Sequence, residues 1–371
     1  MNALRERDAE NFDGIGSAVR SVHLCDFRNY SDQRIDLSSG LNIIAGSNAQ
    51  GKTNFLEALY LVSSTRLLRG IRDVEAIRES QNIAQVTVTI GNGSTELCVR
   101  LERGIKKKGK LNGLQLPRAA DLLGRLPCVC ISAEDMKIVR GDPSDRRLFL
   151  DLELSQLFPA YLHHLSLYKR ALDQRNALLK ASQIEFVHNE GFEVWEEPML
   201  EHGEAMRRMR RQFLNSLHDE SVPIHDEMSN GEALAVKYVE KGVLTELSVN
   251  RGRDIERGTT TAGPHRDDLE ITVNERDARL YGSQGQQRTA VIALKLGCLL
   301  VAKGVLGVPP LLLLDDILSD LDETRRKMLV KIVLEHASQA VLTCTESTAA
   351  GQEMLDRCRL FSVNNGTIDR L

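Results

Sequence analysis

The residues with the clearest chemical potential occupy positions 46–53, where the sequence reads Gly-Ser-Asn-Ala-Gln-Gly-Lys-Thr. This stretch fits G-x-x-x-x-G-K-[ST], the pattern of a loop that wraps nucleotide phosphates. Gly46 and Gly51 permit backbone conformations in which successive N–H groups point at phosphate oxygens. Lys52 is expected to reach the β- and γ-phosphates, and Thr53 to ligate Mg²⁺. The residues expected to bind ATP are Gly46, Ser47, Asn48, Ala49, Gln50, Gly51, Lys52 and Thr53.

The flanking segments decide between a phosphate loop and a glycine-rich turn that matches by chance. Residues 41–45 form a short apolar run typical of a strand, and residues 54–61 carry apolar side chains at helical spacing. Strand, loop and helix is the order that a phosphate loop requires, so the context favours a nucleotide site.

A second group of candidate residues follows the apolar run 311–314, which is typical of a buried strand. This run ends in Asp315 and Asp316. A nucleotide site needs one carboxylate near Mg²⁺ and another that polarises the attacking water. We therefore expect Asp315 to be the metal ligand and Asp316 the catalytic carboxylate. The alternative interpretation is an apolar strand that simply ends in a polar turn. The phosphate loop upstream makes this alternative less favoured than a nucleotide site.

Composition limits the class of protein. The 371 residues are 42% hydrophobic and 27% charged, as in a globular protein with room for more than one domain. The net charge of −4 means that any nucleic-acid binding must use a local basic face. The seven cysteines include no C-x-x-C pair, which favours a reduced cytoplasmic chain. Charged residues and prolines interrupt the apolar region 290–314, which argues against a membrane span.

Two basic tracts leave alternatives open. Residues 103–110 follow two expected antiparallel strands at 86–90 and 96–101, and form either a solvated hairpin tip or a contact with DNA phosphates. The DNA contact would use Lys106, Lys107, Lys108 and Lys110. Apolar faces at 161–179 and 195–217 predict two long helices that pack together as a hairpin, and the tract 207–211 lies on the second of them. For this tract a solvated face is the preferred interpretation and a second basic contact the alternative.

The order of the motifs resembles the ATP-binding-cassette class of ATPases. Ser283, Gly285 and Gln286 lie in a Ser-x-Gly-x-Gln signature that opens a helix, upstream of the strand with Asp315 and Asp316. In that class the signature helix of one subunit covers the γ-phosphate held by another subunit. The resemblance therefore implies a homodimer formed with ATP, in which Ser283, Gly285 and Gln286 contact the nucleotide in trans.

Further motifs are similar to those of the RecF family of DNA repair and recombination proteins. They are Phe-Arg-Asn-Tyr at 27–30, Ser-Ala-Glu-Asp at 132–135, the stretch 141–147 and Gly-Pro-His-Arg-Asp-Asp at 263–268. The resemblance implies an ATP-dependent, nucleoid-associated protein that binds duplex or gapped and junction DNA. It also implies partners of the RecO and RecR type and help in loading a RecA-type recombinase. By the same resemblance Arg28 contacts nucleotide and Glu134 lies near the metal.

The expected fold is α/β, an ABC-type ATPase head with a phosphate-loop mixed sheet and an antiparallel β subdomain. Residues 18–140 and 258–371 would form this lobe, residues 141–257 an inserted helical lobe, and residues 1–17 a loose tail. Turnover is expected to be slow, because Asp316 is shorter than the glutamate of many relatives and residues 342–346 contain no switch histidine. The alternatives are a scaffold that binds ATP without hydrolysis and, less favoured, a transporter-type ATPase subunit.

Overall fold

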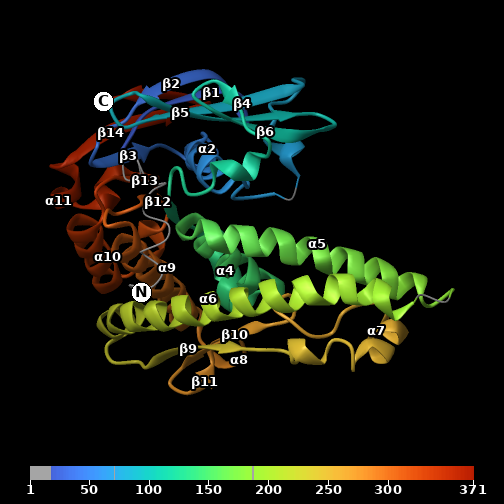
Figure 1. Ribbon diagram of the computed structural model, residues 1–371. Helices are drawn as coiled ribbons and strands as arrows, with labels where there is room; N and C mark the ends of the chain where they lie inside the picture. Colours follow the sequence, from blue (N-terminus) through green and yellow to red (C-terminus); the bar gives the residue numbers. More distant parts are fainter. Residues whose placement is uncertain (1–17, 71, 186–187) are drawn as a thin grey trace. The chain divides into compact units, whose positions relative to one another are not determined.

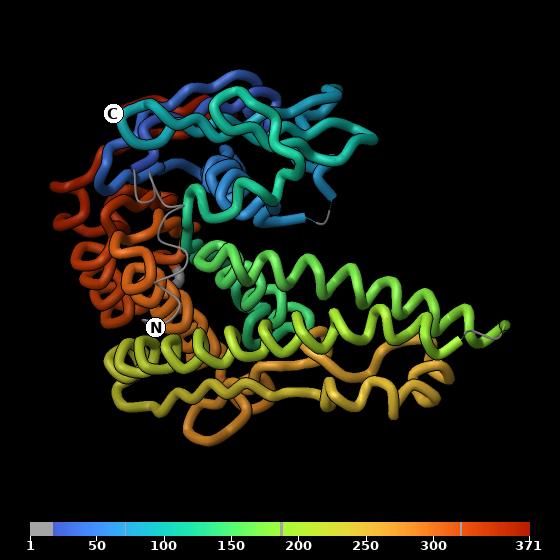
Figure 2. Tube along the Cα trace, in the orientation of Figure 1, coloured from blue at the N-terminus to red at the C-terminus, as the bar shows by residue number. Residues whose placement is uncertain are grey.

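The computed structural model describes residues 18–70, 72–185 and 188–371, which form two compact units (Figures 1 and 2). The first unit holds the described residues up to Met136, with Glu220–Glu232 and Arg288–Leu371. The second holds Lys137–Asp219 and Ala233–Gln287. The loose tail expected at residues 1–17 lies outside the described residues.

A mostly parallel sheet forms the base of the first unit. Its strand order is β15 (Thr367–Arg370), β14 (Cys358–Asn364), β3 (Leu41–Ala45), β13 (Ala340–Cys344), β12 (Leu311–Asp315) and β8 (Cys128–Ile131). The strands from β14 to β8 run parallel, and β15 pairs antiparallel with β14. The four leucines of β12 are buried, as expected for a parallel strand covered on both faces.

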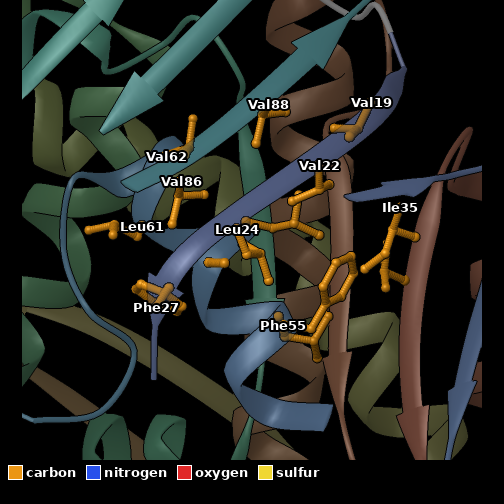
Figure 3. Close-up of a cluster of buried hydrophobic side chains, with 14 of the residues drawn as sticks. Val19, Val22, Leu24, Phe27, Ile35, Phe55, Leu61, Val62, Val86 and Val88 are labelled. Carbon is orange, nitrogen blue, oxygen red and sulfur yellow. The ribbon is translucent and has the colours of Figure 1, made fainter. Parts of the chain in front are cut away.

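An antiparallel sheet is the second layer of this unit. Its order is β2 (Tyr30–Asp36), β1 (Val19–Phe27), β4 (Ile83–Ile90), β5 (Thr95–Glu102), β6 (Ile105–Leu111) and β7 (Leu114–Gln115). Side chains alternate between the two faces of each strand. The inner face carries Val22, Leu24, Val86 and Val88, which belong with Phe55 to one cluster of buried side chains (Figure 3).

Helix α2 (Lys52–Ser64) packs against both sheets and joins them into one core. The same unit contains α10 (Glu323–His336), α11 (Gln352–Leu355) and most of α9 (Gln284–Leu306). Among the described helices, α9 alone has the length and composition of a membrane span. Its most apolar 18-residue stretch is 72% buried, and the buried core helix of a soluble protein has the same length and composition.

The second unit is mainly helical. Its helices are α3 (Lys137–Arg140), α4 (Pro143–Leu157), α5 (Pro159–Ala181), α6 (Asn189–Ser229), α7 (Arg251–Arg257) and α8 (Ala278–Tyr281). A three-stranded antiparallel sheet has the order β11 (Arg276–Asp277), β10 (Asp268–Val273) and β9 (Leu234–Val239). Helices α5 and α6 run antiparallel side by side, as the two apolar faces predicted (Figure 2).

The preferred interpretation of the tract 207–211 as a solvated face is wrong for two of its arginines. Arg207 and Arg210 are 2% and 1% exposed. Arg207 binds Asp267 with N–O distances of 2.8 and 2.9 Å, and Arg210 binds Asp151 at 2.8 Å. A buried charge must be paired, so these residues stabilise the interior of the second unit. Arg208 and Arg211 are exposed.

The two units differ from the division expected at residues 140/141 and 257/258. The segment 258–287, expected in the ATPase lobe, clusters with the helical unit. Strand pairing is the reason, because β10 pairs with β9 along its whole length. Glu220–Glu232, expected in the helical lobe, clusters with the first unit.

Candidate nucleotide site

The loop that joins β3 to α2 has space for glycine alone at two positions. A Cβ on Gly46 would lie 2.6 Å from the carbonyl oxygen of Val363. Gly51 has φ of +122°, and a Cβ there would lie 2.7 Å from Asn29 Nδ2. Other residues rarely adopt such a φ, so the glycines of the motif are required by conformation and by space.

The side chains that follow β1 brace this loop. Asn29 Nδ2 donates to the carbonyl oxygen of Gln50 at 2.9 Å, and Tyr30 Oη donates to that of Gly51 at 2.9 Å. Tyr30 is buried, and its burial raises the pKa of the phenol. The Phe-Arg-Asn-Tyr motif at 27–30 was visible in the sequence, but the bracing role of Asn29 and Tyr30 was not predicted.

Lys52 is the first residue of α2, and its side chain folds over the loop. Nζ donates to the carbonyl oxygens of Gly46 at 2.5 Å and Ser47 at 2.9 Å. The first turn of α2 carries no acidic side chain. The ammonium group and the positive end of the helix therefore lie together where a phosphate chain would bind.

A hydroxyl and a carboxylate meet beside the loop, at the carboxyl end of β12. Thr53 Oγ1 donates to Asp315 Oδ1 at 2.9 Å, and Thr343 Oγ1 donates to the same oxygen at 2.9 Å. Burial raises the pKa of Asp315, and the hydrogen bonds from Thr343 and Thr53 oppose that rise. Oxygen ligands of this kind suit Mg²⁺, so Thr53 and Asp315 fit the ion expected here.

Asp316 lies in a conformation that is rare for aspartate. Its φ is +50°, and its backbone N–H donates to Thr343 Oγ1 at 2.9 Å. Ser319 Oγ donates to Asp316 Oδ1 at 2.8 Å. Strained backbone of this kind is often found at functional sites. The role of Thr343 was not predicted, because it depends on the pairing of β12 with β13. Ser319 acts within the turn that follows β12, three residues after Asp316.

Glu134 and Arg28, the two residues assigned to the site by family resemblance alone, differ in what they contact. Glu134 is half-buried in the short turn after β8, which neighbours β12 in the sheet, so it lies at the same carboxyl edge as Asp315. Arg28 donates to both carboxylate oxygens of the fully buried Glu57 at 2.7 and 3.0 Å, and to two backbone carbonyls. These bonds give Arg28 a positioning role, and its contact with nucleotide stays a prediction.

The signature residues belong to the second unit and cap the start of α9. Gln286 N donates to Ser283 Oγ at 3.2 Å, and Ser283 N donates to Gln286 Oε1 at 2.8 Å. This reciprocal pair is a capping box, which fixes the first turn of a helix. Ser283 is exposed, while Gly285 and Gln286 are partly buried. The N-terminal end of α9 at Ser283 is thus well defined and open to solvent.

The lysines of the basic tract 103–110 lie on strand β6, and only Arg103 and Gly104 form the hairpin turn. Lys108 pairs with Arg100, and Lys110 with Cys98, on the neighbouring strand. Lys107 Nζ instead bonds to Asp73 Oδ1 at 2.9 Å. Lys106 is exposed.

Comparison with known proteins gives consistent likenesses over the whole described chain. A family model described as RecF/RecN/SMC N terminal domain matches residues 18–369. The DNA replication and repair protein RecF of Lachnoclostridium phytofermentans is 36% identical over 361 residues, covering 95% of this chain and 99% of that protein. The protein of the same name from Clostridium botulinum is 34% identical over 371 residues, covering 95% and 100%.

Two solved structures extend these likenesses. A structure of the recombination mediator protein RecF with ATP has a TM-score of 0.88 and 30% identity, covering 97% of this chain and 99% of that one. An Smc head has a TM-score of 0.58 at 15% identity, covering 95% and 97%, and shows likeness of fold alone. The phosphate loop and its two sheets define an ATP-binding-cassette type of ATPase head. Within that class, the chain belongs to the RecF family.

Proposed function

We propose that this protein is an ATP-dependent DNA-binding protein of recombinational repair that acts as an ATP-induced dimer. The main support is the contact of Thr53 with Asp315, which gathers the phosphate loop, a metal-type carboxylate and Asp316 at one sheet edge. The proposed ATPase lobe is the first unit, extended by the signature segment at the start of α9.

In the proposed reaction the first unit holds and cleaves the nucleotide. Lys52 Nζ would exchange its two loop carbonyls for oxygens of the β- and γ-phosphates. Thr53, Asp315 and Glu134 are the proposed ligands of Mg²⁺, which neutralises phosphate charge when bound. Asp316 would accept a hydrogen bond from the attacking water and orient it toward the γ-phosphate.

The second half of the site is proposed to come from another copy of the chain. The capping box at Ser283 leaves an exposed helix N-terminus, where backbone N–H groups and the helix dipole favour an anion. In the ATP-binding-cassette class this end covers the γ-phosphate of the opposite subunit. Ser283, Gly285 and Gln286 would therefore join two chains only while ATP is bound.

DNA is the proposed macromolecular partner. Within the described part of the chain, Lys106, Lys108 and Lys110 add positive charge to β6 without forming an ion pair, in contrast to Lys107. Their contacts would be to phosphates and so independent of sequence. The solved relative is described as a recombination mediator protein of the RecFOR pathway. By extension we propose RecO- and RecR-type partners, gapped or junction DNA, and help in loading a RecA-type recombinase.

Hydrolysis is proposed to be slow and to reset the dimer after DNA has been engaged. ATP would then act mainly as a ligand that shifts the protein between two states. A scaffold that binds ATP without hydrolysis is the second candidate, favoured by the short side chain of Asp316.

ATP turnover with single-stranded, duplex and gapped DNA tests this proposal. We expect a low rate that DNA raises, and loss of both binding and turnover in Lys52→Ala. Absence of turnover with every DNA would contradict the ATPase and favour the scaffold. Turnover that no DNA alters would contradict the proposed link to repair.

A further inference from the structure

Three side chains with metal-binding atoms meet on the outer face of the antiparallel sheet, away from the nucleotide site. His23 and Cys25 are two residues apart on β1, so they share one face, while Val22 and Leu24 point into the core (Figure 3). Asp32 on β2 pairs directly with Cys25. Strand period and register therefore bring the imidazole, the thiol and the carboxylate together.

The distances are close to those of a metal site. His23 Nε2 lies 2.6 Å from Asp32 Oδ1 and 3.3 Å from Cys25 Sγ, and Cys25 Sγ lies 4.0 Å from the same oxygen. Zinc bonds of about 2.0–2.1 Å to nitrogen or oxygen and about 2.3 Å to sulfur place tetrahedral ligands about 3.3–3.6 Å apart. Changes of less than about 1 Å in these distances, made by side-chain rotation, would satisfy this geometry without moving the strands.

A surface ion pair explains only part of this arrangement. The side chains of His23 and Asp32 are 41% and 78% exposed, and exposed pairs contribute little to stability. The pair also leaves unexplained why a thiol faces the same imidazole nitrogen. A thiolate and a carboxylate together carry two negative charges, which match a divalent cation. Sulfur and imidazole ligands select zinc over magnesium or calcium.

We propose that His23, Cys25 and Asp32 form a three-ligand zinc site whose fourth position is open to water. The ion would join β1 to β2, the two strands on either side of the turn from which Asn29 and Tyr30 brace the phosphate loop. Zinc bound at this place stabilises the folded hairpin, because binding to the native state alone raises stability.

Cobalt(II) added to the full chain without nucleotide tests the site directly. A thiolate ligand gives a near-ultraviolet charge-transfer band, which oxygen ligands at the nucleotide site do not give. We expect one equivalent of Co²⁺ per chain to produce this band and Zn²⁺ to abolish it. Zn²⁺ should also raise the melting temperature of the metal-free chain.

Three variants make the result specific. Cys25→Ser should lose the band and the Zn²⁺-dependent rise in melting temperature, and Asp32→Asn should weaken binding by roughly ten-fold or more. Cys358→Ser is the matched control, since Cys358 is a partly buried free thiol on β14, and it should behave as wild type. The proposal is overturned if the wild type shows no thiolate band, if the band survives Cys25→Ser, or if binding exceeds one equivalent without saturation.

Discussion

Thr53 Oγ1 lies 2.9 Å from Asp315 Oδ1, although 262 positions separate these residues in the chain. The parallel pairing of β12, β13 and β3 brings them together, because the carboxyl ends of parallel strands share one edge of the sheet. Thr343, at the end of β13, contacts both Asp315 and the backbone of Asp316. The geometry of the proposed nucleotide site therefore depends on strand order as much as on the phosphate loop.

Replacing Asp316 with asparagine should stop hydrolysis while ATP still binds. The variant keeps the size of the side chain but loses the charge that is proposed to polarise water, and loss of such a group typically costs about 10²–10⁴-fold in rate. Single-turnover hydrolysis and nucleotide binding measure the two effects separately. Asp356→Asn, an exposed carboxylate on the same unit, should leave both unchanged. Unchanged turnover in Asp316→Asn would remove this carboxylate from the mechanism.

Gly51→Ala and Gly40→Ala form a matched pair that tests the loop geometry. Gly51 has φ of +122° and lies against Asn29, whereas nothing lies within 4 Å of a Cβ on Gly40. Backbone strain of about 1–3 kcal/mol should weaken ATP binding by roughly ten-fold or more in Gly51→Ala. Isothermal titration measures the affinity. Equal affinities for the two variants would show that the loop tolerates a side chain at Gly51.

The lysines of β6 should contribute to DNA binding in proportion to the phosphates they neutralise. Each contact adds a slope of roughly −0.9 in log K against log salt concentration. Lys108→Glu with Lys110→Glu should flatten that slope by about two units. Lys107→Ala should change it less, because Lys107 is paired with Asp73. Lys327→Glu on α10 is the control, and an unaltered slope in the double variant would return the tract to a solvated surface.

Arg210 should be essential for the stability of the second unit. Its guanidinium binds Asp151, Tyr161, Tyr238 and the carbonyl oxygen of Pro264. Removing one partner of a buried ion pair costs about 3–5 kcal/mol, so Arg210→Ala should unfold far more easily in urea. Arg208→Ala, on the exposed face of the same helix, should stay within about 0.5 kcal/mol of wild type. Similar midpoints for the two variants would contradict the structural role of Arg210.

His265 should make stability depend on pH. Burial lowers its pKa from 6.5 to about 4, and Tyr168 Oη lies 2.7 Å from Nδ1. Below the unfolded pKa, the unfolded chain takes up a proton that the folded chain does not, so the free energy of unfolding falls as pH drops from 6.5 toward 4. Urea unfolding across this range should show a shallower fall in His265→Gln. Parallel curves for wild type and variant would rule out this contribution.

The residues proposed to bind and cleave ATP were easier to recognise in the sequence than the residues that hold them in place. The phosphate loop and the Asp315–Asp316 pair carry local patterns that need no tertiary information. Tyr30 and Thr343 could not be predicted, because their roles arise from a turn and a strand end that meet the site only in the folded chain. The proposed zinc site at His23 and Cys25 could be recognised only from the strand pairing that places Asp32 opposite Cys25.

Basic tracts were the least reliable part of the sequence interpretation. A run of arginines looks the same whether it faces solvent or acids from distant segments, so nothing local separated Arg207 and Arg210 from Arg208. The expected domain boundaries differ from the boundaries of the two compact units for a similar reason. The pairing of β9 with β10 joins segments about thirty residues apart, and periodicity alone does not specify partners.

Sedimentation of the Asp316→Asn chain with and without ATP tests the central claim most directly, because stalled hydrolysis keeps ATP bound. We predict a monomer without ATP and a dimer with it. Adding Ser283→Arg should restore the monomer while ATP binding to the phosphate loop persists. A monomer under every condition, or a dimer that Ser283→Arg leaves intact, would contradict a site shared between two chains.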